Sequence, residues 1–342
     1  FRSPSMKVLY FGQYSDGTTS KMRCKVIQKI LKPSIFQVID ANIPFYKTHR
    51  LLRSFGFRYK KGPLINNINK YIIAALKEVT YDLIWVDKAV FITPKTTALL
   101  RSRTKKLIHY TPDPAFTFHK SRLFLKSLPY YDFLVTTKSY ELEHYYKYIK
   151  TEKVLYATQG FDAKLHKPSK HPFSKKEGFV FIGHYEDQRA VVLEKLLQND
   201  IKITLAGIKW YQFAKKHQNN PNLIYLGNGV YGEDYVKTLQ KAKMAWGALS
   251  KWVPELHTTR TFEIPACGTA LVTERNLETQ SFFKDDEAIF YTNENDLIEK
   301  ITFFMNNDKP LEVLTKKGTS RAVTNAYDYN SILNAILKTI LD

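Results

Sequence analysis

Short apolar segments alternate with helical patterns along the chain, and this alternation limits the fold more than any other feature. The apolar segments are rich in β-branched and aromatic residues, which favour strands. Strands separated by helices form parallel sheets, because a parallel connection has to return the chain to the same edge of the sheet. We predict strands at Lys7–Phe11, Phe36–Ile39, Leu83–Val86, Lys106–Tyr110, Phe133–Thr136 and Lys153–Tyr156, and then at Phe179–Ile182, Lys202–Ala206, Leu223–Leu226, Met244–Ala248, Ala270–Thr273 and Ala288–Tyr291.

A chain of 342 residues is long for one core and suits two domains. Residues 161–176 are polar and rich in lysine and carry two prolines, which indicates a linker. We therefore predict an α/β fold with Rossmann-like domains at 6–160 and 177–325, followed by a helix at 326–342. We expect residues 1–5 to be a cloning remnant before a native start at Met6.

Composition points to a cytoplasmic protein. The sequence has no apolar run long enough to span a bilayer and no signal-peptide pattern. Cys24 and Cys267 fall in different predicted domains, and neither has the neighbours of a zinc or redox motif. We expect a reducing compartment, no metal and no cofactor.

Positive charge is concentrated in the first half. Residues 1–170 hold 31 lysines and arginines against 11 acidic residues, whereas residues 171–342 hold 21 of each. Such a half attracts polyanions or an anionic membrane surface. The clusters at 49–61 and 101–106, the first interleaved with Phe55, Phe57 and Tyr59, are typical of interfacial contacts. General solubility is the alternative explanation.

The segment 252–273, WVPELHTTRTFEIPACGTALVT, sets two carboxylates, a histidine and an arginine around a short helix that ends at Gly268. Thr258 or Thr259 is a good N-cap, which would place Glu263 in the second turn and Arg260 about one turn earlier. A carboxylate there can accept both hydroxyls of a ribose, and the helix N-terminus favours a diphosphate. Arg260 and His257 would add contacts to the phosphate. The other interpretation is an ordinary amphipathic helix with a glycine cap.

Five segments in order resemble the two-domain nucleotide-sugar glycosyltransferases of the GT-B fold, especially the CgeB-like group related to glycosyltransferase family 1. They are LYFGQYSDGTTSKMR (Leu9–Arg23), FIGHYEDQR (Phe181–Arg189), LAGIKW (Leu205–Trp210), YLGNGVYGEDYVKTLQKAKMAW (Tyr225–Trp246) and RTFEIPACGTALVT (Arg260–Thr273). The resemblance implies a central cleft between the domains and a last helix that crosses back to the first. It also implies that Glu255 and Glu263 are the paired glutamates of the donor site, that the configuration is retained and that no metal is needed.

Further donor contacts follow from the rule that ligands bind beyond the carboxyl ends of parallel strands. Gly183 would let the backbone approach a phosphate, and His184 or Arg189 would pair with it. The resemblance implies that the loops at Gly207–Trp210 and at 227–231 hold the nucleotide base, with Trp210 and Tyr231 as aromatic contacts. Both aromatic residues could instead fill the core.

The first half contains candidate residues for binding a phosphate or the acceptor. The loop from Gly12 to Ser20 lacks the glycine spacing of dinucleotide and ATP sites. Its hydroxyls and the following cations suit a phosphate or an acceptor, and the residues concerned are Gly12, Thr18, Thr19, Lys21 and Arg23. Asp16 is a candidate base or a turn residue. Asp113, after a strand, resembles the family's acidic element and would deprotonate the acceptor hydroxyl or serve as a rigid turn residue.

We therefore predict a cytoplasmic, metal-independent glycosyltransferase, peripheral on the inner face of the membrane. It would use a nucleotide-sugar donor and a glycan or lipid-linked acceptor in surface-polysaccharide synthesis. The alternatives are a sugar-nucleotide epimerase of the same fold, a protein that binds or modifies nucleic acid, and a catalytically silent scaffold. The basic residues match no known motif for reading nucleic acid.

Overall fold

The computed structural model describes residues 5–117 and 120–342, and the chain divides into two compact units. The first unit holds residues up to Thr158 together with Asn330–Asp342, and the second holds Gln159–Tyr329. The predicted linker at 161–176 lies within the second unit. Its Phe161 is buried and pairs with Asp328 in an isolated bridge.

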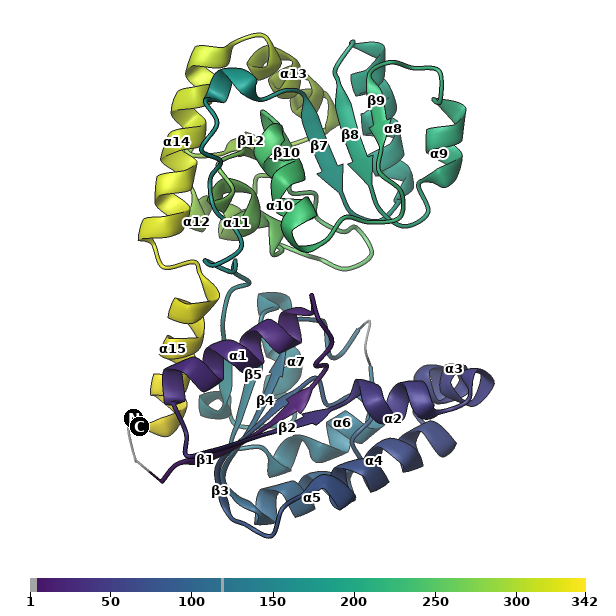
Figure 1. Ribbon diagram of the computed structural model, residues 1–342, viewed down its shortest axis with the longest axis vertical. Coiled ribbons are helices and arrows are strands. Elements are labelled where there is room, and N and C mark those ends of the chain that lie inside the picture. The colour runs from purple at the N-terminus through teal and green to yellow at the C-terminus, as the bar shows by residue number, and fades with distance from the viewer. Residues whose placement is uncertain (1–4, 118–119) are drawn as a thin grey trace. The chain divides into compact units, whose positions relative to one another are not determined.

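The first unit is built on a parallel six-stranded sheet in its described part, with the order β2-β1-β3-β4-β5-β6 (Figure 1). Because the sheet is covered on both faces, apolar residues at the centres of its strands are buried. The strands are β1 (Lys7–Gly12), β2 (Ile35–Asp40), β3 (Tyr81–Asp87), β4 (Thr104–Thr111), β5 (Phe133–Thr136) and β6 (Val154–Tyr156).

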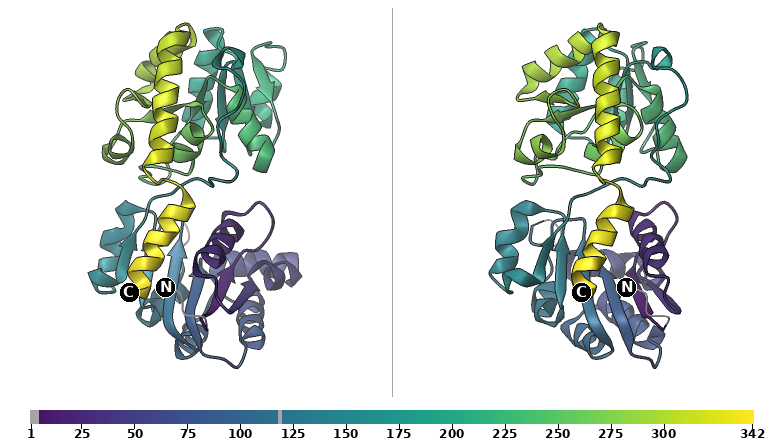
Figure 2. Two further views of the ribbon diagram at one scale, coloured as in Figure 1. Left: turned by 60° about the vertical axis from the view of Figure 1, so that its left-hand side comes forward. Right: turned by 90° about the vertical axis from the view of Figure 1, so that its left-hand side faces the viewer.

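Helices cover both faces of this sheet. One core lies between the sheet and the helices α4, α5 and α6, and it includes Ile68, Leu100 and Phe124. On the other face, α15 lies between α1 and α7 (Figure 2). The helices are α1 (Thr19–Leu31), α2 (Asn42–Lys47), α3 (Arg50–Tyr59), α4 (Pro63–Ala75), α5 (Pro94–Ser102), α6 (Arg122–Ser127), α7 (Leu142–Tyr146) and α15 (Tyr329–Leu341). The last helix therefore joins the first unit, as the GT-B resemblance implies.

The second unit repeats the design, with a parallel sheet in the order β12-β11-β10-β7-β8-β9. Its strands are β7 (Phe179–Ile182), β8 (Ile203–Ala206), β9 (Leu223–Tyr225), β10 (Met244–Trp246), β11 (Ala270–Glu274) and β12 (Ile289–Tyr291). The strand order reverses between β7 and β10, since β8 and β9 extend one side and β10 opens the other. Loops at such a reversal point diverge and leave room for a ligand.

Two cores pack on the two faces of the second sheet. Val192 and Leu297 belong to one core, and Val236 and Phe262 belong to the other. The helices are α8 (Asp187–Gln198), α9 (Tyr211–Lys216), α10 (Gly232–Lys241), α11 (Arg260–Ala266), α12 (Leu277–Phe282), α13 (Glu294–Met305) and α14 (Asp308–Thr324). No described helix is both long and apolar enough to cross a membrane.

A buried ion pair joins α1 to the sheet of the first unit. Arg23 and Asp87 are each about 1% exposed at the side chain, and the guanidinium contacts both carboxylate oxygens, at 2.8 and 3.0 Å. The Tyr10 hydroxyl donates to the same carboxylate at 2.8 Å, and the Arg23 guanidinium lies 4.6 Å from the centre of the Tyr110 ring. Arg23 is thus engaged inside the unit, where it fixes the carboxyl ends of β1 and β3.

Asp87→Asn should destabilise the first unit by about 3–5 kcal/mol, because it leaves the buried Arg23 charge without its partner. Urea unfolding measures this loss. The double variant Arg23→Met with Asp87→Leu should recover most of the stability, since neither charge is then buried alone. Equal stability of Asp87→Asn and the native chain would contradict the assignment.

Candidate donor site in the second unit

The carboxyl end of β7 is closed by two glycines in contact. Gly207 has a φ of +146°, and a Cβ atom built there would lie 1.8 Å from the carbonyl oxygen of Gly183. Only glycine permits this approach. The same carbonyl accepts a hydrogen bond from the Trp210 indole at 2.8 Å. Trp210 is wholly buried, so it shapes this turn from within the core and presents no ring to a base.

Two arginines converge on this strand end. Arg260, the first residue of α11, donates from Nη1 to the carbonyl of Ile182 at 3.0 Å. Arg189, on α8, donates to the carbonyl of His184 at 3.0 Å and pairs with Glu186 at 2.9 Å. Burial first, and then the charge of Arg260, lowers the pKa of Arg189, whereas Glu186 opposes that shift. The charge of Arg260 therefore disfavours the charged form of Arg189.

Both arginines keep unused hydrogen-bonding capacity. The Nε atoms of Arg189 and Arg260 are buried and have no hydrogen-bond partner among the described residues. A buried cation with an unpaired donor is costly unless an anion neutralises it. This strand end is consequently a site prepared for a negatively charged ligand.

His184 and Glu255 adjoin the arginines. Burial first, then Arg189 and Arg260, lower the pKa of His184, which favours the neutral ring at neutral pH. The ring stacks on Trp252, with centroids 5.7 Å apart. Glu255 accepts the backbone N–H of Ser250 at 2.9 Å, so its carboxylate also shapes the loop after β10.

Glu263 lies in the first turn of α11, one turn earlier than its spacing predicted. Its side chain is 13% exposed, and one carboxylate oxygen accepts the Tyr235 hydroxyl at 2.7 Å. The other oxygen lies 3.9 Å from Nε2 of His166. Because Nδ1 of His166 accepts the backbone N–H of Asp162, Nε2 carries the proton and faces the carboxylate. Polar groups therefore hold Glu263 in one orientation.

The helix around Glu263 differs from the prediction in two ways. Thr259 occupies the N-cap position without a side-chain cap, and α11 has only seven residues with Pro265 inside it. Positive charge at this end therefore comes from Arg189 and Arg260 more than from the helix. Gly268 ends the helix with a φ of +73°, as its sequence position predicted, and a Cβ there would press on Pro168 at 3.1 Å.

His257 has no nitrogen left for a phosphate. It is 2% exposed, its Nε2 accepts the backbone N–H of Gln159 at 3.0 Å, and its Nδ1 donates to Glu278 at 2.6 Å. The ring therefore ties three segments of the second unit together. Tyr231 is 74% exposed at the start of α10, where it is accessible to a ligand.

In the first unit, the loop between β1 and α1 has its predicted hydroxyl cap. Thr18 accepts the backbone N–H of Lys21 at 3.2 Å, and Thr19 opens the helix. Lys21 pairs with the exposed Asp16 at 2.7 Å, and this bond lowers the pKa of Asp16, which makes that carboxylate a weaker base. Gly12 fits tightly, because a Cβ there would lie 2.6 Å from Ser20 Oγ.

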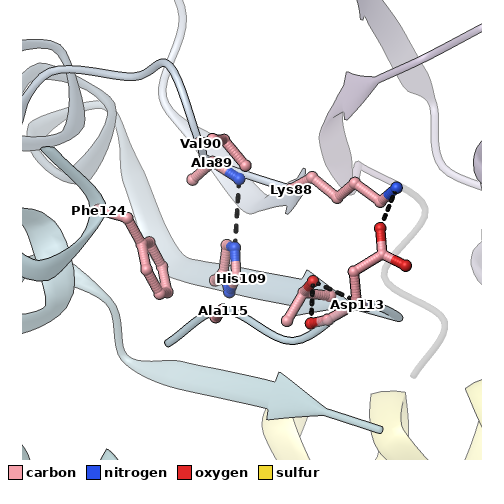
Figure 3. Close-up of a pocket in the computed structure, with 8 residues that line it drawn as sticks. Lys88, Ala89, Val90, His109, Asp113, Ala115 and Phe124 are labelled. Atoms are coloured by element: carbon pink, nitrogen blue, oxygen red, sulfur yellow. Dashed lines mark hydrogen bonds and ion pairs between the residues drawn. The ribbon is translucent and has the colours of Figure 1, made fainter. Parts of the chain in front are cut away.

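Asp113 follows β4 and forms an ion pair with Lys88, and both side chains are one-third exposed. Lys88 adopts a left-handed conformation with a φ of +60°, which a lysine rarely takes. Figure 3 shows the two charged groups at one end of a small pocket and His109 further in. Burial lowers the pKa of His109 to about 3, so its ring is neutral and accepts the Ala89 N–H at 3.2 Å.

Sequence reasoning missed four residues that complete these sites: Tyr235, His166, Glu186 and Lys88. Lys88 directly follows β3 and Glu186 lies in the loop between β7 and α8, so the strand-end rule could have found them. Tyr235 and His166 come from α10 and from the segment taken as a linker, and they reach Glu263 only through the tertiary fold.

Comparison with known proteins gives a family match for part of the chain and the fold of the whole chain. Residues 189–338 match the sequence model of the family described as "Glycosyl transferase-like". The chain has the GT-B fold, and most of its second unit matches this glycosyltransferase-like family. No curated protein matches the sequence. Membership of the CgeB-like group stays a prediction.

Solved structures share the whole two-domain architecture at low identity. HepE of Anabaena, solved with UDP and glucose, is 14% identical with a TM-score of 0.66, covering 98% of this chain and 99% of its own. A glycosyltransferase of Rickettsia africae is 14% identical with a TM-score of 0.69, covering 98% of each chain. Sucrose-phosphate synthase of Thermosynechococcus elongatus is 12% identical with a TM-score of 0.69, covering 97% and 98%.

Tyr235→Phe should lower the free energy of unfolding by about 1.5–3 kcal/mol, because it removes a hydrogen bond to a charged and largely buried carboxylate. Burial and the neighbouring Glu263 raise the pKa of Tyr235, so its hydroxyl remains a donor across the working range. Urea unfolding tests this. Tyr211→Phe, at a 59% exposed tyrosine of the same unit, is the matched control and should change little. Equal losses of stability in the two variants would show that the hydrogen bond from Tyr235 to Glu263 does not stabilise the fold.

Proposed function

We propose that this glycosyltransferase moves a sugar from a nucleotide-sugar donor, held by the second unit, to a glycan or lipid-linked acceptor held by the first. The pair of arginines at the end of β7 carries the proposal. Their unpartnered Nε atoms lie where a diphosphate would compensate both charges. HepE structures with UDP and with UDP-glucose support a uridine nucleotide as the first donor to test.

In this proposal the ribose, the diphosphate and the base of the donor are each assigned to described residues. Glu263 would accept the ribose hydroxyls, and it is held ready by Tyr235 and His166. Arg189 and Arg260 would neutralise the diphosphate as its bond to the sugar breaks, which lowers the barrier for the leaving group. Tyr231, in the loop after β9, would contact the base.

On the acceptor side, Asp113 would orient or deprotonate the acceptor hydroxyl, and its pairing with Lys88 holds the carboxylate in place. Asp16 is the weaker candidate for the base, because its partner Lys21 lowers its pKa. We include retention of the sugar configuration, on the spacing of Glu255 and Glu263.

The excess charge of the first half supports an acceptor carried at an anionic membrane surface. Surface-polysaccharide assembly on the cytoplasmic face supplies acceptors of that kind, and the proposal places the enzyme there. An epimerase would instead change the sugar nucleotide with no acceptor present, so product analysis without acceptor separates the two reactions.

Glu263→Ala should weaken the binding of the correct nucleotide sugar by about 10- to 100-fold, since a hydrogen bond to a charged group contributes about 1.5–3 kcal/mol. Calorimetry with UDP-, GDP-, CMP-, ADP- and dTDP-sugars measures it. Glu233→Ala, whose glutamate side chain on α10 is 83% exposed, is the control and should bind normally. Undiminished affinity in Glu263→Ala, with a donor that the native chain binds, would refute the assignment.

Transfer should continue unchanged in EDTA, because the two arginine cations supply the positive charge that a divalent metal supplies in other transferases. Sugar incorporation into an acceptor, followed with and without the chelator, measures this. Loss of transfer that Mg²⁺ or Mn²⁺ restores would show that the arginines do not suffice.

A further inference from the structure

One surface of the first unit combines unpaired cations with exposed apolar side chains. Residues 41–77 contain eight lysines and arginines and no acidic residue. Six of these cations lie on α2, on α3 and just after it: Lys47, Arg50, Arg53, Arg58, Lys60 and Lys61. None of the six forms an ion pair with any residue in the described part of the chain. The surface therefore carries a net charge that nothing nearby compensates.

Helix α3 presents its apolar stripe to solvent. Leu51, Leu52, Phe55 and Tyr59 share one face by their spacing, and their exposed fractions are 73%, 43%, 48% and 54%. The helix packs on α4 through the buried Gly56, where a Cβ would lie 2.4 Å from that of Leu64. A surface helix normally turns its apolar face to the core. Here Gly56 and Phe57 make the contacts with the rest of the unit, Phe57 through Phe45 and Phe91, and the apolar stripe stays uncovered.

The neighbouring side chains extend this surface. Tyr46 of α2 is 65% exposed, and the Arg53 guanidinium lies 5.1 Å from the centre of its ring. Arg58 lies 5.6 Å from the centre of the Tyr59 ring. Arginines beside amphipathic aromatic rings suit the boundary between water and lipid, where the rings enter the headgroup region and the charges reach the phosphates.

The cations and the apolar stripe together distinguish among the partners that could bind this surface. A second copy of this surface would set cations against cations with no acid to pair them. A nucleic acid would pair with the cations but would leave the apolar stripe in water. An anionic bilayer satisfies both features, since it attracts lysine and arginine and accepts apolar side chains.

We propose that α2 and α3 form a membrane-docking surface for an anionic lipid bilayer, with Leu51, Leu52 and Phe55 inserted at the headgroup boundary. The inference goes beyond sugar transfer, because lipid binding is measured with neither donor nor acceptor present. Failure of one proposal is thus distinguishable from failure of the other.

Sedimentation of the full chain with vesicles of phosphatidylcholine, with and without phosphatidylglycerol, tests the surface. The native chain should bind only the anionic vesicles, and added salt should weaken binding. The triple variant Leu51→Ser, Leu52→Ser and Phe55→Ser should bind about 100-fold more weakly, since three apolar side chains no longer insert. The control triple variant Leu277→Ser, Phe303→Ser and Val313→Ser changes apolar positions of the second unit that are at least as exposed, and it should bind normally. Thermal melting of both variants checks that they are folded.

A nitroxide on Leu52→Cys reports insertion directly. Cys24 and Cys267 are buried, and burial raises the pKa of each thiol to about 12, so the label should react at position 52 alone. Anionic vesicles should shield this label from a water-soluble relaxation agent, and they should leave a label at Leu277→Cys accessible. The proposal would be overturned if the label at position 52 stayed accessible to the relaxation agent, or if the first triple variant bound vesicles as tightly as the native chain. Tighter binding to duplex DNA than to anionic vesicles would also overturn it.

Discussion

Parallel pairing of short strands is the constraint on which the rest of this structure depends. In each unit the described strands pair in parallel, so every connection returns over a face of the sheet and all carboxyl ends meet at one edge. Side chains that follow different strands are thereby collected in one place. Gly183 follows β7 and Gly207 follows β8, and their backbone contact exists because β7 and β8 are neighbours in register. Ligand sites in such parallel sheets lie at those edges.

Two like charges at one strand end are the feature of the second unit on which the proposed diphosphate site rests. Arg189 and Arg260 donate hydrogen bonds to backbone carbonyls at the reversal point of the sheet. These bonds reduce the free-energy cost of holding two positive charges there, but they do not remove it. Glu186 compensates one of them, and the unpaired Nε atoms remain. By contrast, Arg23 and Asp87 in the first unit neutralise each other completely and serve stability. Arg260, which is held by a backbone carbonyl, and Arg189, which shares its carboxylate contact with a carbonyl, thus differ from Arg23, whose guanidinium contacts both oxygens of one carboxylate.

Helices and strands could be predicted where the apolar period was clear, and they were missed where it was not. The strands follow the predicted ranges closely, since local pattern and core agree there. Helix α3 was read as a charged cluster, because its apolar stripe does not face a core. Among site residues, Glu263 and Arg260 were predicted from their spacing and Arg189 from its place after a strand, and their roles stay predictions. Arg23, His257 and Trp210 looked like ligand contacts, although each is engaged in the interior.

The sequence by itself determined the class of fold, the order of its strands along the chain, the excess of positive charge in the first half and the short helix that carries Glu263. These features depend on local periodicity and composition, which are properties of residues close together in the sequence. Only the tertiary structure decided which polar side chains are already paired. Tyr235 and His166 meet Glu263, and Lys88 meets Asp113, across long sequence separations. Partnership of that kind arises from packing, and no local pattern of residues encodes it.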